Sequence, residues 1–355
     1  MRISGFETCA AASDSARSSS DDIWGLYTPW PSYLQHMPLV ITSLPAGTRF
    51  AITAEAEMPT ITATAALQGQ AIPQGIAPIY EWSATLTFDG SAPATSATFG
   101  GGRSTQHSRI AQQTSANPQW RIPFTEVRGG LLSVQVVMRV GTTEHRARVN
   151  WTIVGTNPTG TAIRAFANGI GANRAVFRKK MRQESSLQQF RTPSNWPKYS
   201  SDGLGGVGLC QLTRPAPTAD QTWSWKENVR GGWALYLEKE RIARAYPRNV
   251  RNGERFRNLV TAWNRARTTQ GLPALPVELP DYTPEQLELD TLRGFNGYAN
   301  SLHEYRVRVE NGALFVTVDP SGTRGLAEWE RVPVADRGTV GDPNYVENVL
   351  AQSDF

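Results

Sequence analysis

Residues 173–186 read NRAVFRKKMRQESS, and a glycine-rich segment, GLGGVGLCQL, follows at 203–212. In the first stretch the residues at helical spacing are Val176, Phe177, Lys180, Met181 and Glu184, which predicts a helix whose buried stripe ends in a carboxylate. Partial burial favours the protonated form of a carboxyl group, and a general acid needs that form. The glycines let backbone approach a ligand closely, and Gln211 adds an amide. The two stretches indicate a helical domain with a candidate site at Glu184.

The sequence around these stretches is mainly helical. Helical patterns cover 162–168, 226–244 and 253–269. Thr283-Pro-Glu-Gln286 supplies an N-cap threonine, a proline at the first helical position and a glutamine at the third, so it predicts a helix that runs toward residue 293. Residues 305–318 are typical of a hairpin with an Asn-Gly turn. We therefore expect residues 157–355 to form a mainly α domain with a small β-hairpin.

The preceding part of the chain is rich in β-strand patterns. Short runs with alternating or β-branched residues are separated by turn formers, and they cover 39–42, 50–54, 60–65, 80–88, 131–140 and 145–154. This spacing predicts an antiparallel β-sandwich over residues 36–156. Its strand pattern, with Trp82 in mid-strand, is similar to an immunoglobulin-like domain without the cysteine pair. The segment at 99–103 and the polar stretch after it predict a long loop.

The fold class that follows is multidomain α and β. Residues 1–35 are rich in Ser, Ala, Asp and Pro before they turn aromatic, and we expect them to form a flexible or docking segment. A turn-rich segment at 155–160 separates the β-sandwich from the helical domain.

The amino-acid composition limits the kinds of functional site that we expect. The chain has two cysteines and four histidines, none at metal-ligand spacing, so we expect no metal, no cofactor and no disulfide. No run is long enough to span a membrane, and no nucleic-acid motif accompanies the net charge of +5. Carboxylates and hydrogen bonds are then expected to supply any catalysis.

Five segments of the helical half occur in an order that resembles the lysozyme-like lytic transglycosylases, which share a fold with goose-type lysozymes. The segments are QESS at 183–186, GLCQL at 208–212, NVRGGWALYL at 228–237, GFNG at 294–297 and NYVENVL at 344–350. The family patterns are Glu-Ser at a helix end, Gly-Leu-Met-Gln, an Asn-Ile…Gly…Tyr-Leu helix, Ala-Tyr-Asn-Gly and a late Tyr-Val. Cys210 replaces the usual methionine and Phe295 replaces the usual tyrosine.

The resemblance implies cleavage of the MurNAc-β-1,4-GlcNAc bond of peptidoglycan, with Glu184 as the single general acid and base. In this family the same carboxylate then activates the 6-hydroxyl of the sugar, which gives a 1,6-anhydro end. The substrate-binding or supporting residues that it implies are Ser185, Gly208, Gln211, Phe295, Asn296 and Tyr345.

Asp202 leaves a second mechanism open. Goose-type lysozymes carry an aspartate at a similar place before their Gly-Leu-Met-Gln segment. If Asp202 holds a water opposite Glu184, hydrolysis with inversion follows; if it caps the loop, the anhydro product is expected.

The resemblance also implies the binding partners of the protein. Peptidoglycan glycan strands are the expected substrate, and a non-catalytic wall-binding protein is the alternative, motivated by Phe295 and the 305–318 insertion. The start of the chain lacks the pattern of a cleavable signal. We therefore expect action in the periplasm or at the cell wall after delivery by a contractile secretion system, a phage particle or lysis, as for an antibacterial effector. The N-terminal domain would contact the secretion or tail component, and an immunity or inhibitor protein would cover the cleft.

Overall fold

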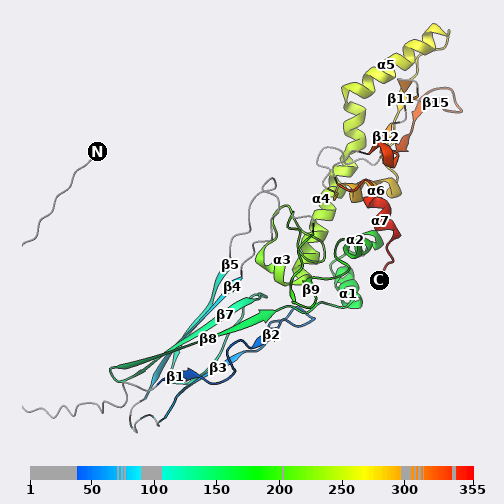
Figure 1. The fold of residues 1–355 in the computed structure, drawn as a ribbon. Coiled ribbons are helices and arrows are strands. Elements are labelled where there is room, and N and C mark those ends of the chain that lie inside the picture. Colours follow the sequence, from blue (N-terminus) through cyan, green and yellow to red (C-terminus); the bar gives the residue numbers. More distant parts are fainter. Residues whose placement is uncertain are drawn as a thin grey trace, which may run out of the picture. The chain divides into compact units, whose positions relative to one another are not determined.

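The computed structural model describes residues 38–355 apart from 70–71, 73–74, 76, 89–105, 202–203, 297–304, 308, 311–312, 315 and 338–340. The predicted docking segment at 1–35 and the loop at 99–103 lie outside the described residues. Pro38–Phe355 forms one compact unit, and its described part contains helices and several sheets, as predicted for a mixed α and β protein (Figure 1). In this part, no helix combines the length and hydrophobicity that crossing a membrane requires.

The largest sheet has five strands in the order β2-β8-β7-β4-β5. Buried and exposed residues alternate along β7, because a strand with one face on the core has a period of two. The pairs β4–β7, β7–β8 and β4–β5 are antiparallel, whereas β2–β8 is parallel, a pairing that the prediction of an antiparallel sandwich did not include. The strands are β2 (Arg49–Ala51), β4 (Ile79–Phe88), β5 (Gln106–Ser115), β7 (Gly130–Val140) and β8 (Thr143–Val154).

Strand β5 corrects the prediction of a long loop after residue 103. Its sequence, QHSRIAQQTS, is too polar for a strand to be predicted from the pattern of hydrophobic residues. Backbone pairing with β4 along Tyr80–Phe88 forms it nevertheless, at the edge of the sheet. Edge strands tolerate polar residues because they bury less side chain than central strands.

A second, three-stranded sheet shares a core with the first. Its order is β1-β3-β6, with antiparallel pairs. Trp82 of β4 and Trp120 of β6 are both buried, and their ring centroids lie 5.9 Å apart. The buried faces of the two sheets therefore meet at these rings. The strands are β1 (Leu39–Ile41), β3 (Thr62–Leu67) and β6 (Gln119–Arg121).

The helices follow the sheets in the chain. They are α1 (Gly160–Gly169), α2 (Ala175–Ser185), α3 (Ala219–Trp223), α4 (Trp225–Asn252), α5 (Glu254–Thr269), α6 (Pro284–Arg293) and α7 (Tyr345–Ala351), with a 3-10 turn, η3, at Val334–Asp336. The predicted start of α6 is confirmed: Thr283 and Gln286 form a capping box with Pro284 in the first turn. Helix α4 continues beyond the expected residue 244 to Asn252 and contains Pro247.

Short strands occupy the connections between helices. They are β9 (Phe190–Arg191), β10 (Trp196–Pro197), β11 (Val277–Glu278), β12 (Tyr305–Val307), β13 (Val309–Glu310), β14 (Ala313–Leu314), β15 (Val316–Val318), β16 (Gly325–Ala327) and β17 (Trp329–Arg331). The predicted hairpin at 305–318 is more divided than expected. Only β13 and β14 pair across its turn, whose residues Asn311 and Gly312 are not described; β12 pairs with β17 and β15 with β16.

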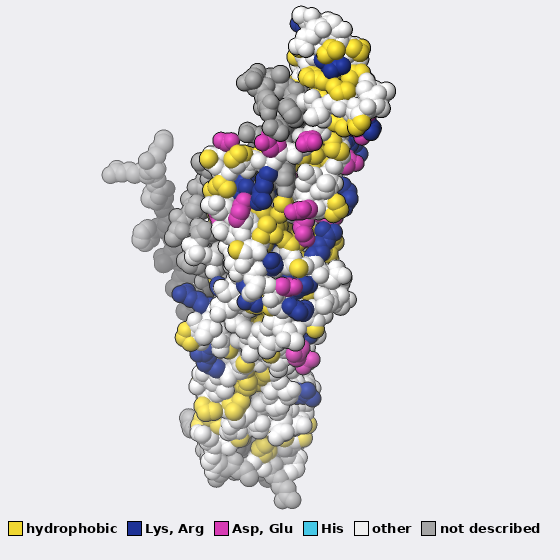
Figure 2. Space-filling model, turned by 90° about the vertical axis from the view of Figure 1, so that its right-hand side faces the viewer, with side chains coloured by type: hydrophobic (Ala, Val, Ile, Leu, Met, Phe, Trp, Pro, Cys, Tyr) yellow, Lys and Arg dark blue, Asp and Glu magenta, His cyan; other side chains and the backbone are white. Residues whose placement is uncertain are grey.

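Two hydrophobic clusters fill the interior. One lies chiefly among the sheets and the other chiefly among the helices, yet each crosses the predicted boundary at residue 156. Trp223 and Phe190 belong to the sheet cluster, and Ala56 belongs to the helical cluster. Charged side chains gather on the helical part of the face in Figure 2, whereas the lower part of that face is mostly uncharged.

Candidate functional site

Glu184 lies in the last turn of α2. The helix stops at Ser186, which has a left-handed φ of 54°, and the side chain of Glu184 is 23% exposed. The carbonyl end of a helix carries partial negative charge and therefore disfavours a carboxylate. A stable anion at this position needs a cation or a hydrogen-bond donor nearby.

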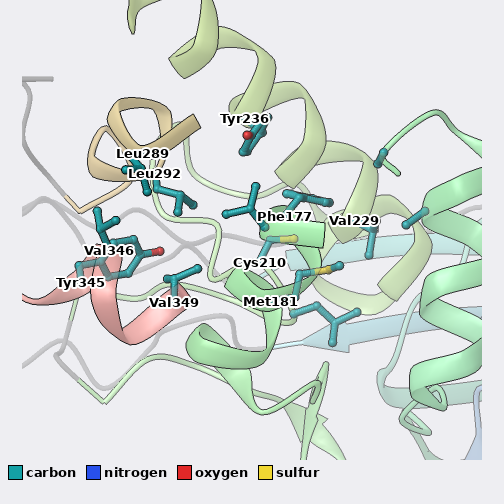
Figure 3. Packing of buried hydrophobic residues seen from close by; sticks show 14 of the residues in the cluster. Phe177, Met181, Cys210, Val229, Tyr236, Leu289, Leu292, Tyr345, Val346 and Val349 are labelled. Carbon is teal, nitrogen blue, oxygen red and sulfur yellow. The ribbon is translucent and has the colours of Figure 1, made fainter. Parts of the chain in front are cut away.

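Tyr345 supplies the donor from the first turn of α7. Its hydroxyl donates to Oε1 of Glu184 at 2.5 Å, which joins residues 161 positions apart in the chain. Burial first, and then the charge of Glu184, raises the pKa of Tyr345 well above its ordinary value. The phenol consequently keeps its proton and remains a hydrogen-bond donor. Figure 3 shows its ring inside the hydrophobic cluster that also contains Phe177, Met181 and Cys210.

Lys180 supplies the cation from one turn earlier in α2. It is 1% exposed, and its Nζ lies 3.7 Å from Oε1 of Glu184. The same Nζ donates to the carbonyl oxygen of Cys210 at 3.2 Å and lies 4.3 Å from the ring centroid of Phe295. A buried charge is tolerated only where it is paired and hydrogen-bonded. Lys180 thus connects Glu184, the glycine loop and the GFNG segment at a single point.

The glycine loop forms a tight turn between Val207 and Leu212. These two residues bond to each other through both backbone N–H groups at 3.1 Å, and between them Gly208 and Gln211 adopt left-handed φ angles of 71° and 49°. A Cβ at Gly208 would lie 2.3 Å from the Gln189 side chain, so only glycine fits there.

Two buried side chains hold this loop from outside. Oε1 of Gln189 accepts from the N–H of Leu209 at 3.1 Å. Asn228 of α4 accepts from the N–H of Cys210 and donates to the carbonyl of Val207, both at 2.9 Å. Both side chains are 0% exposed. Because buried backbone groups need partners, these amides fix the loop in one shape.

One acceptor of Gln211 is unused among the described residues. Its Nε2 donates to the carbonyl of Gly208 at 2.7 Å, whereas its buried Oε1 has no hydrogen-bond partner in the described part of the chain. An unsatisfied buried polar atom is costly and calls for an explanation such as a ligand or a water. A small hydrogen-bond donor such as a water would satisfy it.

Asn296 braces the segment that leads into α7. Its Nδ2 donates to the carbonyl of Asp342 at 2.5 Å, and its Oδ1 accepts from the N–H of Asp342 at 3.1 Å. The Asp342 carboxylate in turn accepts from the N–H of Asn344 and from Nδ2 of Asn348, each at 2.8 Å. Asn296 therefore orients the helix that carries Tyr345.

The remaining predicted site residues lie as follows. Ser185 is 1% exposed, and its hydroxyl donates to the carbonyl of Met181 at 2.9 Å, so it supports α2 from inside. Cys210 is buried, and burial is the main cause that raises the pKa of its thiol to about 12, so it serves as packing. Asp202 lies outside the described residues.

The sequence assigned no role in the site to three residues of this arrangement: Lys180, Gln189 and Asn228. Lys180 could have been found, because a lysine within an apolar helical stripe one turn before Glu184 needs a partner. Asn228 opens the NVRGGWALYL segment, so the sequence marked its position but not its contact with the loop. Gln189 left no signal, since single amides on a loop are common.

The structure thus brings Glu184 together with Tyr345 and Lys180, and Lys180 in turn contacts Phe295 and the backbone of Cys210. Asn296 braces the segment before Tyr345. No family model matches the chain, and no curated protein matches it significantly.

Proposed function

We propose that the protein cleaves the MurNAc-β-1,4-GlcNAc bond of peptidoglycan as a lytic transglycosylase, with Glu184 as the general acid and base. The hydrogen bond from Tyr345 to Glu184 carries the proposal. It pairs the first and the last of five sequence segments that resemble this family in order. The finer fold assignment, an immunoglobulin-like sandwich followed by a lysozyme-like domain, belongs to the same proposal.

The chemistry proceeds in two proton transfers. Glu184, as the acid, gives its proton to the glycosidic oxygen while the bond from that oxygen to C1 of MurNAc breaks. The Glu184 carboxylate then takes the proton of the C6 hydroxyl as O6 bonds to C1, which closes the 1,6-anhydro ring. The carboxyl group is regenerated and no water is consumed.

Neighbouring side chains assist these steps. Tyr345 orients the carboxyl group, and Lys180 compensates the anion that forms after the first transfer. Gln211 shapes the glycine loop beside Lys180, since its Nε2 donates to the carbonyl of Gly208. Hydrolysis remains the alternative outcome if Asp202 positions a water.

A non-catalytic wall-binding protein is the second candidate. Phe295 favours it, because the family pattern has a tyrosine there, and the Phe295 ring faces Lys180 instead of offering a hydroxyl. Such a protein would sediment with sacculi and release no fragments.

Digestion of purified sacculi tests the proposal. We expect the wild type to release muropeptides that are one water lighter than hydrolytic products, as measured by mass spectrometry. Glu184→Gln should release none under conditions where its far-UV signal shows it folded, and its unfolding midpoint should fall because buried Lys180 loses its anionic partner. Glu238→Gln, an exposed carboxylate on α4, is the matched control and should remain active. Unreduced lysis by Glu184→Gln would contradict the proposal.

A further inference from the structure

The positive charge of the chain is concentrated in one helical stretch. Residues 238–267 contain nine Lys and Arg and three Asp and Glu, a net charge of +6, whereas the whole chain carries +5. The stretch spans the second half of α4 and nearly all of α5, and we call it the arginine arm. Eight of its nine basic residues are arginine, the cation that binds carboxylates in a bidentate manner.

Several of these arginines have no ion-pair partner within the described part of the chain. Arg241, Arg248, Arg255, Arg257 and Arg265 are exposed and form no ion pair with any residue that the structure describes. Arg244 pairs with Glu240 at 2.7 Å, and Arg251 pairs with Asp281 at 2.7 Å. Like charges three or four positions apart destabilise a helix, so an uncompensated series has a cost for folding.

The arm also offers a surface. Arg241, Arg244 and Arg248 fall within about 60° of the helix circumference, since each residue advances by about 100°. Beyond them, a hollow of about 480 Å³ has Glu254, Arg255, Asn258 and Leu259 among its described lining residues. An extended anionic chain could contact this face at several points.

Helix α4 links this face to the candidate site. Asn228, in the first turns of α4, holds the glycine loop, and Arg241 and Arg248 follow on the same helix. At 1.5 Å per residue they lie about 20 and 30 Å farther along it. A polymer can reach both places at once, whereas a short saccharide cannot.

We propose that the arginine arm binds the stem-peptide carboxylates of peptidoglycan and thereby holds the polymer while Glu184 acts on one bond. This inference rests on the proposed function and adds the anionic stem peptides to the substrate. Charge complementarity selects the partner: stem peptides carry free carboxylates spaced along each glycan strand, and several arginine contacts would then add as in multivalent binding.

Co-sedimentation with purified sacculi tests this inference. The full chain with Glu184→Gln is used so that the wall stays intact. Adding R241Q/R248Q/R255Q should raise the Kd at least tenfold. The control triple R121Q/R146Q/R148Q removes the same charge from exposed positions on the sheets and should change the Kd less than twofold. Equal binding by the two triples would overturn the inference.

Two further binding experiments identify the ligand. Sacculi whose carboxylates have been amidated should bind the Glu184→Gln chain at least tenfold more weakly; undiminished binding would exclude stem-peptide carboxylates. If R241Q/R248Q/R255Q loses affinity for duplex DNA and keeps its affinity for sacculi, the arm serves nucleic acid and the inference is wrong.

A cleavage comparison separates the two proposals. In a chain that is otherwise wild type, R241Q/R248Q/R255Q should lower cleavage of sacculi at least fivefold and leave kcat/KM on a short soluble muropeptide unchanged. If binding depends on the arginine arm but the wild type cleaves nothing, the proposed catalytic role of Glu184 is wrong and the arm proposal stands. If the wild type and R241Q/R248Q/R255Q cleave both substrates equally well, the arm proposal is wrong and the proposed role of Glu184 stands.

Discussion

At the scale of single residues, the surroundings of Glu184 combine opposing effects. The helix end disfavours its negative charge, whereas Lys180 and Tyr345 favour it. Lys180 also depends on Glu184, because it is almost fully buried and the carboxylate is its nearby anion among the described residues. A change at either residue therefore alters the electrostatics of both.

Replacing Tyr345 tests the hydrogen bond. Tyr345→Phe keeps the buried ring and removes the donor, and hydrogen bonds to charged groups contribute about 1.5–3 kcal/mol. We expect roughly a tenfold to hundredfold loss in muropeptide release. Because the pKa of Tyr345 is raised well above its ordinary value, the loss should be equal from pH 5 to pH 9. A loss confined to alkaline pH would contradict the assignment of the phenol as a donor.

At the scale of elements, α2 is fixed by the segment that follows α7. The guanidinium of Arg178 donates to both oxygens of Asp354 at 2.7 Å, and Arg164 lies 3.7 Å from one of them. The hydrogen bonds from Arg178 are the main cause that lowers the pKa of Asp354 to about 2. This pair links the helix that carries Glu184 to the segment that follows α7.

Asp354→Asn should lower the free energy of unfolding by about 1 kcal/mol at pH 7. The full pKa shift would correspond to more, but the side chain is 32% exposed and solvent screens the pair. Because the folded-state pKa is depressed, the stabilisation is present above pH 4 and is lost as the pH falls from about 4 to about 2.

Urea unfolding of the wild type and Asp354→Asn at several pH values checks this window. The difference between the two proteins should vanish near pH 2. Glu328→Gln, an exposed carboxylate, serves as the control and should match the wild type at each pH. A difference that persists unchanged at pH 2 would show that the pair contributes through packing.

Elements differ in how far the sequence predicts them. The capping box of α6 is local chemistry, so its start could be predicted from four residues. Strand β5 could not, because backbone pairing with β4 forms it and its side chains carry little signal. The same distinction applies to the site: Glu184, Gln211 and Asn228 stand in recognisable segments. The hydrogen bonds that hold the glycine loop were not predictable, because they join side chains to backbone groups distant in sequence.

At the scale of the whole unit, the junction between sheets and helices is a packed core. The ring of Trp223 lies 4.9 Å from that of Phe88 and 6.0 Å from that of Phe190, measured between centroids. Trp225 reaches the sheet side as well, since its Nε1 donates to the carbonyl of Ala54 at 2.9 Å. We therefore expect sheets and helices to unfold together.

Gly129→Ala probes this junction. A Cβ at Gly129 would lie 2.2 Å from the Trp223 ring, so one of them must move, and overpacking of this kind costs about 1–3 kcal/mol. Gly169→Ala is the control, because its Cβ would meet no atom within 4 Å and stability should change by less than about 0.5 kcal/mol.

Two probes of urea unfolding reveal the coupling. Near-UV signals report on the tryptophans and far-UV signals on the helices, and Gly129→Ala should shift both midpoints together. If only the near-UV midpoint moves, the packing around the tryptophans and the helices do not unfold in one transition, which would contradict the expected coupling.

The glycine loop has a consequence for protein engineering. Its conformation is determined by Gln189 and Asn228, which belong to other parts of the chain. Transplanting residues 207–212 alone into another scaffold would transfer the sequence of the loop without its conformation. A transferable unit has to include α2, the segment through Gln189 and the first turns of α4, so the smallest graft of this site is a piece of tertiary structure.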